Sequence, residues 1–172
     1  MLLGADLTTV SLSLGSNIER YRHINRGLNA LEAAFGALLC SPVYESEAVG
    51  FDGNAFLNMI AAIETEHSLS EVVQILKNIE DQNGRDRQGP KFSPRTLDID
   101  VVTYGNAAGE LEGVEMPRPE LFKNAFVALP LADIWPDRMV PGRTLSFLEL
   151  WQQEGNHRQE LRAVEFRRDR TL

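Results

Sequence analysis

Residues 95–104 read Arg-Thr-Leu-Asp-Ile-Asp-Val-Val-Thr-Tyr, a stretch that has the composition of a buried β-strand. Side chains alternate between the two faces of a strand, so Asp98 and Asp100 point the same way. Two neighbouring carboxylates repel each other and lose hydration, a cost that a divalent cation offsets. The pair therefore predicts a magnesium site, although an Asp-x-Asp pattern alone is a weak signal that also occurs in structural edge strands and loops.

The segment just upstream of this strand concentrates positive charge. Between Gly84 and the strand, four cations, Arg85, Arg87, Lys91 and Arg95, accompany a single anion, Asp86. Arginine binds phosphate oxygens in a bidentate manner, and carboxylates bind Mg²⁺. Together they indicate a site for nucleotide phosphates. Arg85 has an alternative role, since a cation just after a helix also neutralises the helix dipole.

The bulk properties indicate one globular domain over residues 1–172, with 43% hydrophobic and 24% charged residues. The formal net charge of −8 argues against a nucleic-acid or anionic-membrane surface. The single cysteine, Cys40, excludes an intrachain disulfide, and its apolar surroundings predict a small core residue. No segment has the ~20 apolar residues of a membrane span, so we expect a cytoplasmic protein.

Hydrophobic periodicity outlines the elements around this strand. We expect strands over 8–14, 38–44, 56–64 and 98–104, a weaker strand over 111–116, and helices over about 19–35, 126–134 and 144–152. A capping box formed by Ser68 and Glu71 begins another helix, which Gly84 ends. The order strand, helix, strand, strand, helix, strand predicts an α+β fold, the ferredoxin-like βαββαβ sandwich with helices packed on an antiparallel sheet. The charged segment 162–170 gives no clear signal.

Four motifs at this spacing resemble the 6-hydroxymethyl-7,8-dihydropterin pyrophosphokinase family. They are Gly15-Ser16-Asn17, Phe56-Leu57-Asn58, Gly84-Arg85 and the block from Ser93 to Asp100. The resemblance covers about residues 8–137, and residues 138–172 form a C-terminal extension of uncertain role. It implies an ATP-dependent diphosphotransferase of folate biosynthesis, which transfers pyrophosphate from ATP to 6-hydroxymethyl-7,8-dihydropterin and releases AMP.

The resemblance also assigns roles to individual residues. It implies that Asp98 and Asp100 hold two Mg²⁺ ions, and that Arg85 and Arg95 join them as catalytic residues. The implied ATP-binding residues are Glu80, Arg85, Arg87, Lys91, Arg95 and Arg118. The implied pterin-binding residues are Gly15, Ser46, Val49, Phe56, Asn58 and Phe126. The expected partners are these two small molecules, with no nucleic acid and no membrane, and the expected state is a monomer.

Structural explanations compete with several of these roles. Phe56 and Phe126 stand in apolar runs that suit a core, and Gly15 and Asn17 could cap the first helix. Asn58 is harder to explain structurally, because a buried amide needs partners.

Several positions depart from the family pattern. Arg118 stands where a histidine is usual, Asn124 where an arginine is common, Phe92 replaces a tryptophan and Ser93 a glycine. These changes keep open a catalytically altered paralogue that binds a modified pterin or nucleotide with little turnover. A two-metal nucleotidyl transferase acting on nucleic acid is a further alternative, which the acidic charge disfavours.

Overall fold

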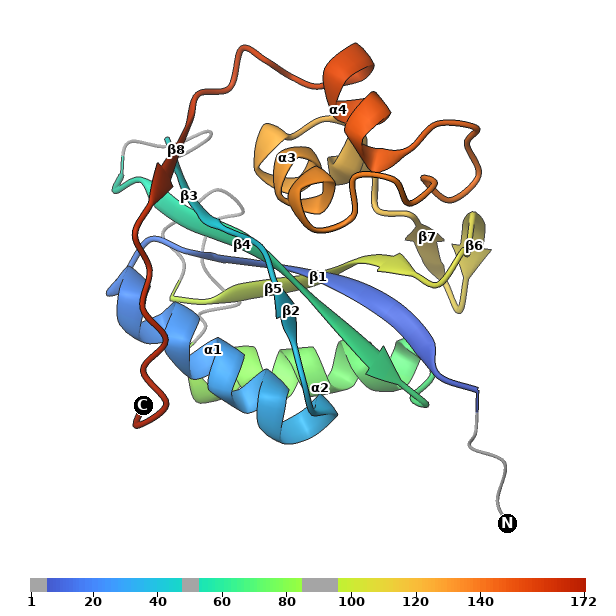
Figure 1. Ribbon diagram of the computed structural model, residues 1–172. Helices are drawn as coiled ribbons and strands as arrows, with labels where there is room; N and C mark the ends of the chain where they lie inside the picture. The colour runs from blue at the N-terminus through green and yellow to red at the C-terminus, as the bar shows by residue number, and fades with distance from the viewer. Residues whose placement is uncertain (1–5, 48–52, 85–95) are drawn as a thin grey trace.

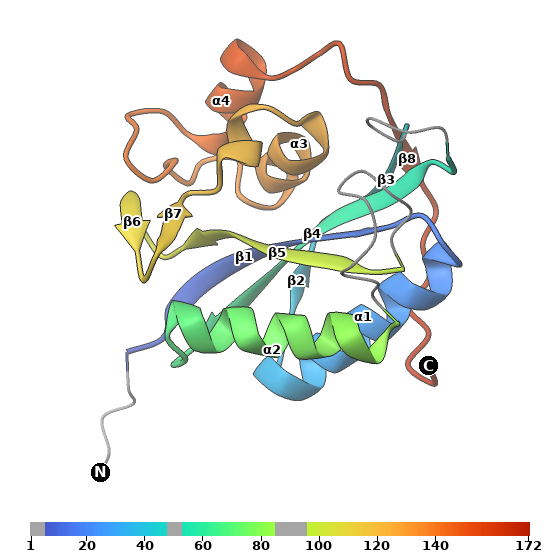
Figure 2. The ribbon, with the colours of Figure 1, turned by 180° about the vertical axis from the view of Figure 1, so that it is seen from behind.

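The computed structural model describes residues 6–47, 53–84 and 96–172. The strands are β1 (Thr8–Ser16), β2 (Leu39–Cys40), β3 (Val43–Ser46), β4 (Phe56–Thr65), β5 (Asp98–Tyr104), β6 (Gly109–Leu111), β7 (Val114–Met116) and β8 (Leu161–Val164). The helices are α1 (Arg20–Phe35), α2 (Leu69–Gln82), α3 (Ala125–Ile134) and α4 (Phe147–Glu154), with a 3₁₀ turn at Pro119–Phe122. Figures 1 and 2 show α1 and α2 on one face of the central sheet and α3 and α4 on the other.

The main sheet has the strand order β5-β1-β4-β3-β8, and β2 also pairs with β4. Each of these pairings is antiparallel. Strands β1, β3, β4 and β5, together with helices α1 and α2, reproduce the expected βαββαβ arrangement. The ferredoxin-like prediction is therefore confirmed. Strand β8 extends this sheet beyond β3.

The hydrophobic core is divided by the sheet. On β5 the residues Leu97, Ile99 and Val101 belong to the cluster that includes the buried faces of α1 and α2, whereas Val102 belongs to the cluster under α3 and α4. Alternation along the strand therefore places Asp98 and Asp100 on the α3 and α4 face. This face carries the polar residues considered below.

The second helix begins as the sequence predicts. Ser68 Oγ accepts from the amide of Glu71 at 3.2 Å, and the Glu71 carboxylate accepts from the amide of Ser68 at 2.9 Å. This reciprocal capping box satisfies two backbone donors that the start of a helix would otherwise leave unpaired.

The single strand expected over 38–44 is wrong in detail. It is divided into β2 and β3 at Ser41-Pro42, because proline has no amide for the ladder. Ser41 Oγ accepts from the amide of Ile60 at 2.8 Å. Cys40 is exposed on the two-residue β2, so its assignment to the core is also wrong.

Two further expectations need correction. Asn17 does not cap α1, since the residue before the helix is Glu19 and the Asn17 side chain donates to the carbonyl of Asn54 at 3.1 Å. The weak strand over 111–116 is a hairpin formed by β6 and β7.

Candidate active site

A row of residues across the sheet brings the predicted metal and pterin positions together. Gly15 on β1 lies opposite Asp98 on β5 and also opposite Asn58 on β4, and Asn58 in turn lies opposite Tyr44 on β3. Residues directly opposite each other on antiparallel strands share a face. Asp98 and Asn58 are thus two strand spacings apart, about 10 Å, with only a glycine between them.

The Asp pair lies in an environment that favours a cation. Partial burial raises the pKa of Asp100 to about 7, and the Asp98 carboxylate contributes in the same direction. The carboxylates of Glu80 and Glu120 add smaller effects of the same sign. Oxygen donors of this kind suit hard cations such as Mg²⁺. The residues present therefore fit a metal of this type.

Arg118 lies next to the same pair. Its guanidinium is 4.0 Å from Asp100 Oδ1 and 3.2 Å from Glu120 Oε2, and it lowers the pKa of Asp100 against the other influences. The backbone fixes its position, because the Arg118 amide donates to the carbonyl of Val102 at 2.9 Å. Arg118 thus provides a permanent cation beside the Asp pair.

Glu80 supports the strand that carries the Asp pair. It is 5% exposed, and its Oε2 accepts from the amide of Ile99 at 2.9 Å, on the side of β5 that faces away from β1. This bond fixes the backbone between Asp98 and Asp100. Glu80 therefore helps to position the Asp pair, in addition to the nucleotide role that the resemblance implies.

Replacing Glu80 by alanine is expected to destabilise the fold by about 1–3 kcal/mol, because a buried amide loses its acceptor. Urea denaturation of the metal-free protein measures this change. Glu110, which is exposed on β6, offers a matched control whose replacement by alanine should leave the midpoint nearly unchanged. Equal midpoints for the Glu80 variant and the wild type would contradict the assignment.

On the other side of Gly15, the Asn58 amide is held in a fixed orientation. Its Nδ2 donates to Ser46 Oγ at 2.7 Å, and Asn58 and Ser46 are 6% and 7% exposed. A side chain added at Gly15 would come within 3.5 Å of Asn58 Oδ1 and 3.7 Å of the Phe56 ring. Gly15, Asn58 and Phe56 therefore meet on this face, and the glycine keeps the space above the amide open.

Helix α3 carries the second predicted ring and packs over this part of the sheet. Phe126 stands in its first turn and is half-buried against the cluster under α3 and α4. Tyr44 connects β3 to the same helix, since its hydroxyl donates to Asp133 Oδ2 at 2.5 Å. Burial and this hydrogen bond raise the pKa of the Tyr44 phenol.

Five predicted site residues lie outside the described part of the chain: Val49, Arg85, Arg87, Lys91 and Arg95. The same holds for Phe92 and Ser93. Of the residues that are described, the structure brings together Asp98, Asp100, Arg118 and Glu80 around β5, and Gly15, Ser46, Asn58 and Phe56 around β4. Within the described ranges no group of three or more Asp, Glu, His or Cys side chains could hold a metal ion.

Comparison with known proteins identifies the family. The family model described as 7,8-dihydro-6-hydroxymethylpterin-pyrophosphokinase (HPPK) matches residues 11–136. The chain belongs to the HPPK family. Among curated relatives, the 2-amino-4-hydroxy-6-hydroxymethyldihydropteridine pyrophosphokinase of Pseudomonas aeruginosa is 36% identical over 79% of this chain and 86% of its own. The Bacillus subtilis protein of the same name is 33% identical over 72% of this chain and 75% of its own.

Solved structures support the HPPK fold independently of sequence. A Plasmodium falciparum HPPK-DHPS triple mutant superposes with a TM-score of 0.69 at 12% identity, over 88% of this chain. This chain spans 44% of the length of that longer protein. At such low identity the likeness concerns the fold alone. None of the helices in the described ranges is both long and apolar enough to span a membrane.

The sequence did not single out three contacts near the HPPK site. These are the acceptor role of the Ser46 hydroxyl, the bond from Tyr44 to Asp133, and the bonds from Gln159 to the start of α3 at 2.6 and 3.1 Å. None of these residues forms a motif with its chain neighbours. Each contact depends on a pairing between distant segments.

Proposed function

We infer that this chain transfers pyrophosphate from ATP to 6-hydroxymethyl-7,8-dihydropterin, giving the pterin diphosphate and AMP in folate biosynthesis. Family membership supports this reaction, as do the names of the relatives. The structural observation that carries it is the row Asp98, Gly15 and Asn58, which sets a carboxylate pair beside a fixed amide on one face. A donor of phosphates and a small heterocyclic acceptor could meet there.

The carboxylates of Asp98 and Asp100 would hold two Mg²⁺ ions, and such ions, when bound, would supply positive charge to offset the charge of the triphosphate. Arg118 adds a fixed positive charge at the same place, 4.0 Å from Asp100. Glu80 holds the strand between the two aspartates in position. From their place in the sequence we propose that Arg85, Arg87, Lys91 and Arg95 bind phosphate oxygens.

The acceptor would lie over Gly15. Asn58 would present its amide to the donor and acceptor edge of the pterin, while Ser46 prevents the amide from rotating. Phe56 and Phe126 would stack on the ring, and the backbone at Val49 would complete the site. The chain's contribution to the rate is then positioning of the hydroxymethyl oxygen toward the β-phosphorus of ATP, since no protein nucleophile is required.

The finer properties are proposed on the same basis. We propose that residues 1–172 act as one domain, as a monomer, in the cytoplasm. The altered-paralogue alternative is disfavoured, because Arg118 keeps a cation beside Asp100 and the Asp pair is intact.

Incubation with ATP, Mg²⁺ and 6-hydroxymethyl-7,8-dihydropterin tests the reaction. We expect stoichiometric AMP and pterin diphosphate, without ADP, and no AMP when the pterin or Mg²⁺ is omitted. Binding of both substrates without AMP release would instead support the paralogue.

A further inference from the structure

The segment 156–164 connects two elements that flank the pterin side of the site. Its first part contacts the start of α3. There Gln159 Oε1 accepts from the amide of Ala125 at 2.6 Å, and Gln159 Nε2 donates to Asn124 Oδ1 at 3.1 Å. Asn156 Nδ2 also donates to the carbonyl of Lys123 at 3.2 Å. The start of α3, one residue before Phe126, is thus held by side chains from the C-terminal extension.

The Gln159 contact replaces a missing cap. Asn124 is the residue before α3, but its side chain makes no capping hydrogen bond. The first amides of a helix have no partner within the helix and need an external acceptor. Gln159 supplies one to Ala125, a fully buried residue, and its own amide group holds Asn124. Asn124, which stands where the family commonly has an arginine, therefore has a docking role in this chain.

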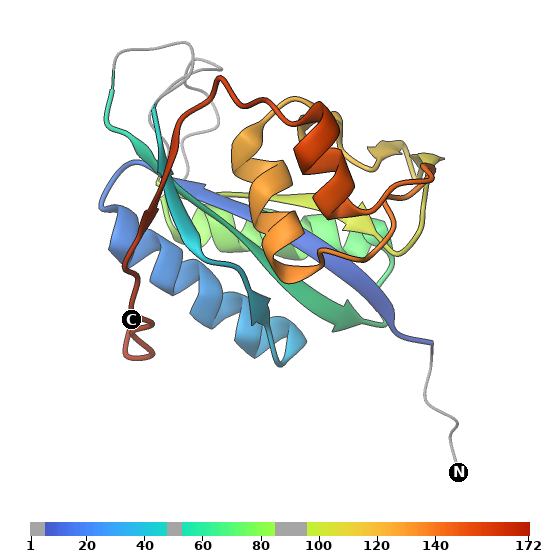
Figure 3. The same cartoon turned by 45° about the horizontal axis from the view of Figure 1, so that its top comes forward.

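The same segment continues along the sheet as β8. Figure 3 shows this strand, drawn in dark red, running along the edge of the sheet. In the register with β3, Leu161 lies opposite Ser46, Arg162 opposite Glu45 and Ala163 opposite Tyr44. Arg162 forms an ion pair with Glu45, which also binds Arg20 at 2.7 Å. Strand β3 in turn holds Asn58 through the Ser46 hydroxyl.

We propose that residues 156–164 are a positioning element for the pterin, with Gln159 as its principal residue. The proposal rests on the function inferred above. Gln159 fixes the helix that carries Phe126, while β8 fixes the strand that orients Asn58, so one segment sets the distance between ring and amide. Gln159 acts through these residues and does not itself contact the substrate.

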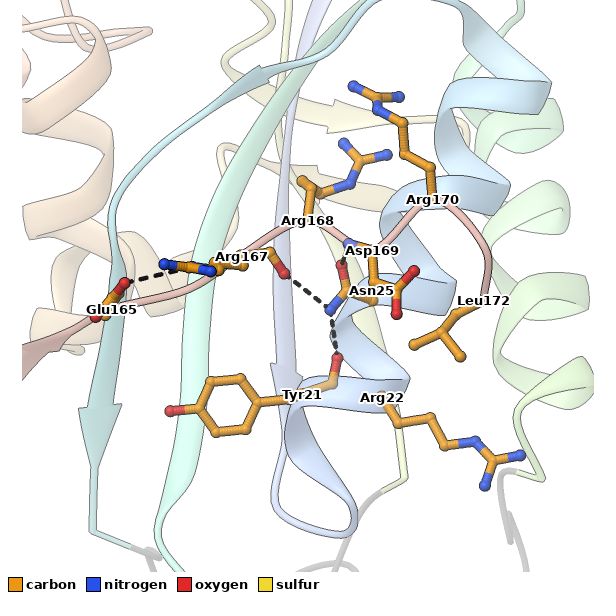
Figure 4. Close-up of a pocket in the computed structure, with 9 residues that line it drawn as sticks. All are labelled: Tyr21, Arg22, Asn25, Glu165, Arg167, Arg168, Asp169, Arg170 and Leu172. Carbon is orange, nitrogen blue, oxygen red and sulfur yellow. Dashed lines mark hydrogen bonds and ion pairs between the residues drawn. The ribbon is translucent and has the colours of Figure 1, made fainter.

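The end of the chain is held elsewhere by separate contacts, as Figure 4 shows for the tail over α1. Asn25 Nδ2 donates to the carbonyl of Arg167 at 3.2 Å, and Asn25 Oδ1 accepts from the amide of Asp169 at 2.7 Å. Asn29 Nδ2 donates to the carbonyls of Asp169 and Leu172, each at 2.9 Å. Asn29 therefore offers a matched control, because its loss loosens the tail without touching α3 or β3.

The test compares Gln159→Ala, Gln159→Glu and Asn29→Ala in the full chain. For Gln159→Ala we expect the KM and Kd for 6-hydroxymethyl-7,8-dihydropterin to rise roughly fivefold or more, as for a lost part-buried hydrogen bond. The KM for ATP should stay within twofold. Gln159→Glu keeps the acceptor for Ala125 and suits a helix N-terminus, but it loses the donor to Asn124 Oδ1. It should therefore recover only part of the pterin affinity that Gln159→Ala loses. Asn29→Ala should leave both constants unchanged.

Several results would overturn the proposal. One is a pterin Kd within twofold of the wild type in Gln159→Ala, and another is a parallel rise in the ATP constant, which indicates general loss of structure. Should Gln159→Ala fold poorly, Gln159→Met keeps the side-chain length and is judged by the same criteria. Wild-type AMP release is measured first, so failure of the reaction itself is distinguished from failure of the positioning role, and the direct Kd needs no turnover.

Discussion

An Asp100→Asn variant is expected to release no measurable AMP, a loss of at least about a thousandfold, while its metal-free form melts a few degrees above the wild type. The loss follows from the proposed metal role, because a neutral amide cannot replace a carboxylate as a ligand for a hard cation. The gain follows because burial, and next to it the Asp98 carboxylate, disfavour the ionised form of Asp100 in the folded wild-type protein and so raise its pKa. Steady-state kinetics and thermal denaturation measure the two effects.

The pH dependence of stability shows why replacing Asp100 by asparagine should raise, and not lower, the melting temperature. The folded protein raises the pKa of Asp100 to about 7, above the ~3.9 of an unfolded chain. Ionisation of Asp100 therefore reduces stability as the pH rises from about 4 to about 7, and the whole reduction is present above 7. The melting difference between variant and wild type should be largest near pH 8 and vanish near pH 4. Because 44% of the Asp100 side chain is exposed, the difference should be modest.

Added Mg²⁺ gives a third readout that needs no nucleotide. It should raise the melting temperature of the wild type at pH 8 and have little effect on Asp100→Asn. Asp137→Asn, at an exposed position, serves as the control with normal turnover and melting. Near-normal AMP release by Asp100→Asn would refute the metal site.

Asn58→Leu is expected to raise the Kd for the pterin about a hundredfold or more, with ATP binding within twofold. A site built to hydrogen-bond a polar heterocycle binds it poorly once the matching group is lost, since the polar edge of the pterin is then buried without hydrogen bonds. Leucine has the same branched shape and the same number of side-chain heavy atoms, so packing against the sheet should change little. Fluorescence titration with the pterin, and with a nonhydrolysable ATP analogue, measures the two affinities.

Ser46→Ala tests whether the Ser46 hydroxyl orients the Asn58 amide for pterin binding. It removes the acceptor that holds Asn58 Nδ2 at 2.7 Å but leaves the amide itself in place. A roughly fivefold loss of pterin affinity is expected, smaller than for Asn58→Leu.

A pterin Kd for Asn58→Leu within threefold of the wild type would exclude Asn58 as a pterin ligand.

Much of the fold could be predicted because local signals agree with it. The capping box of Ser68 and Glu71 and the apolar spacing of α1 and β5 are properties of consecutive residues, and the structure contains all of them. The break between β2 and β3 was missed although Pro42 marks it. Strand β8 was missed because it lacks a clear alternation and depends on pairing with β3 across more than a hundred residues.

The site was predicted only partly from residue chemistry. The period of a strand places Asp98 and Asp100 on one face, but nothing local shows that Gly15 separates them from Asn58, because this depends on strand order. The motif resemblance supplied that grouping. The role of Glu80 could not be predicted from either source, because its carboxylate accepts from the amide of Ile99, a tertiary contact that no motif indicates. The assignments on 85–95 remain predictions, since those residues lie outside the described ranges.

Strand β8 also bears on solubility. Without it, β3 would expose a row of unpaired amides and carbonyls, the template on which chains add edge to edge and aggregate. The replacement edge is only four residues long, at Leu161–Val164, and is flanked by Glu160 and Glu165. Short, charged edges of this kind resist such addition. Shortening the chain before residue 161 would therefore leave β3 as an unpaired edge and make the sheet prone to self-assembly.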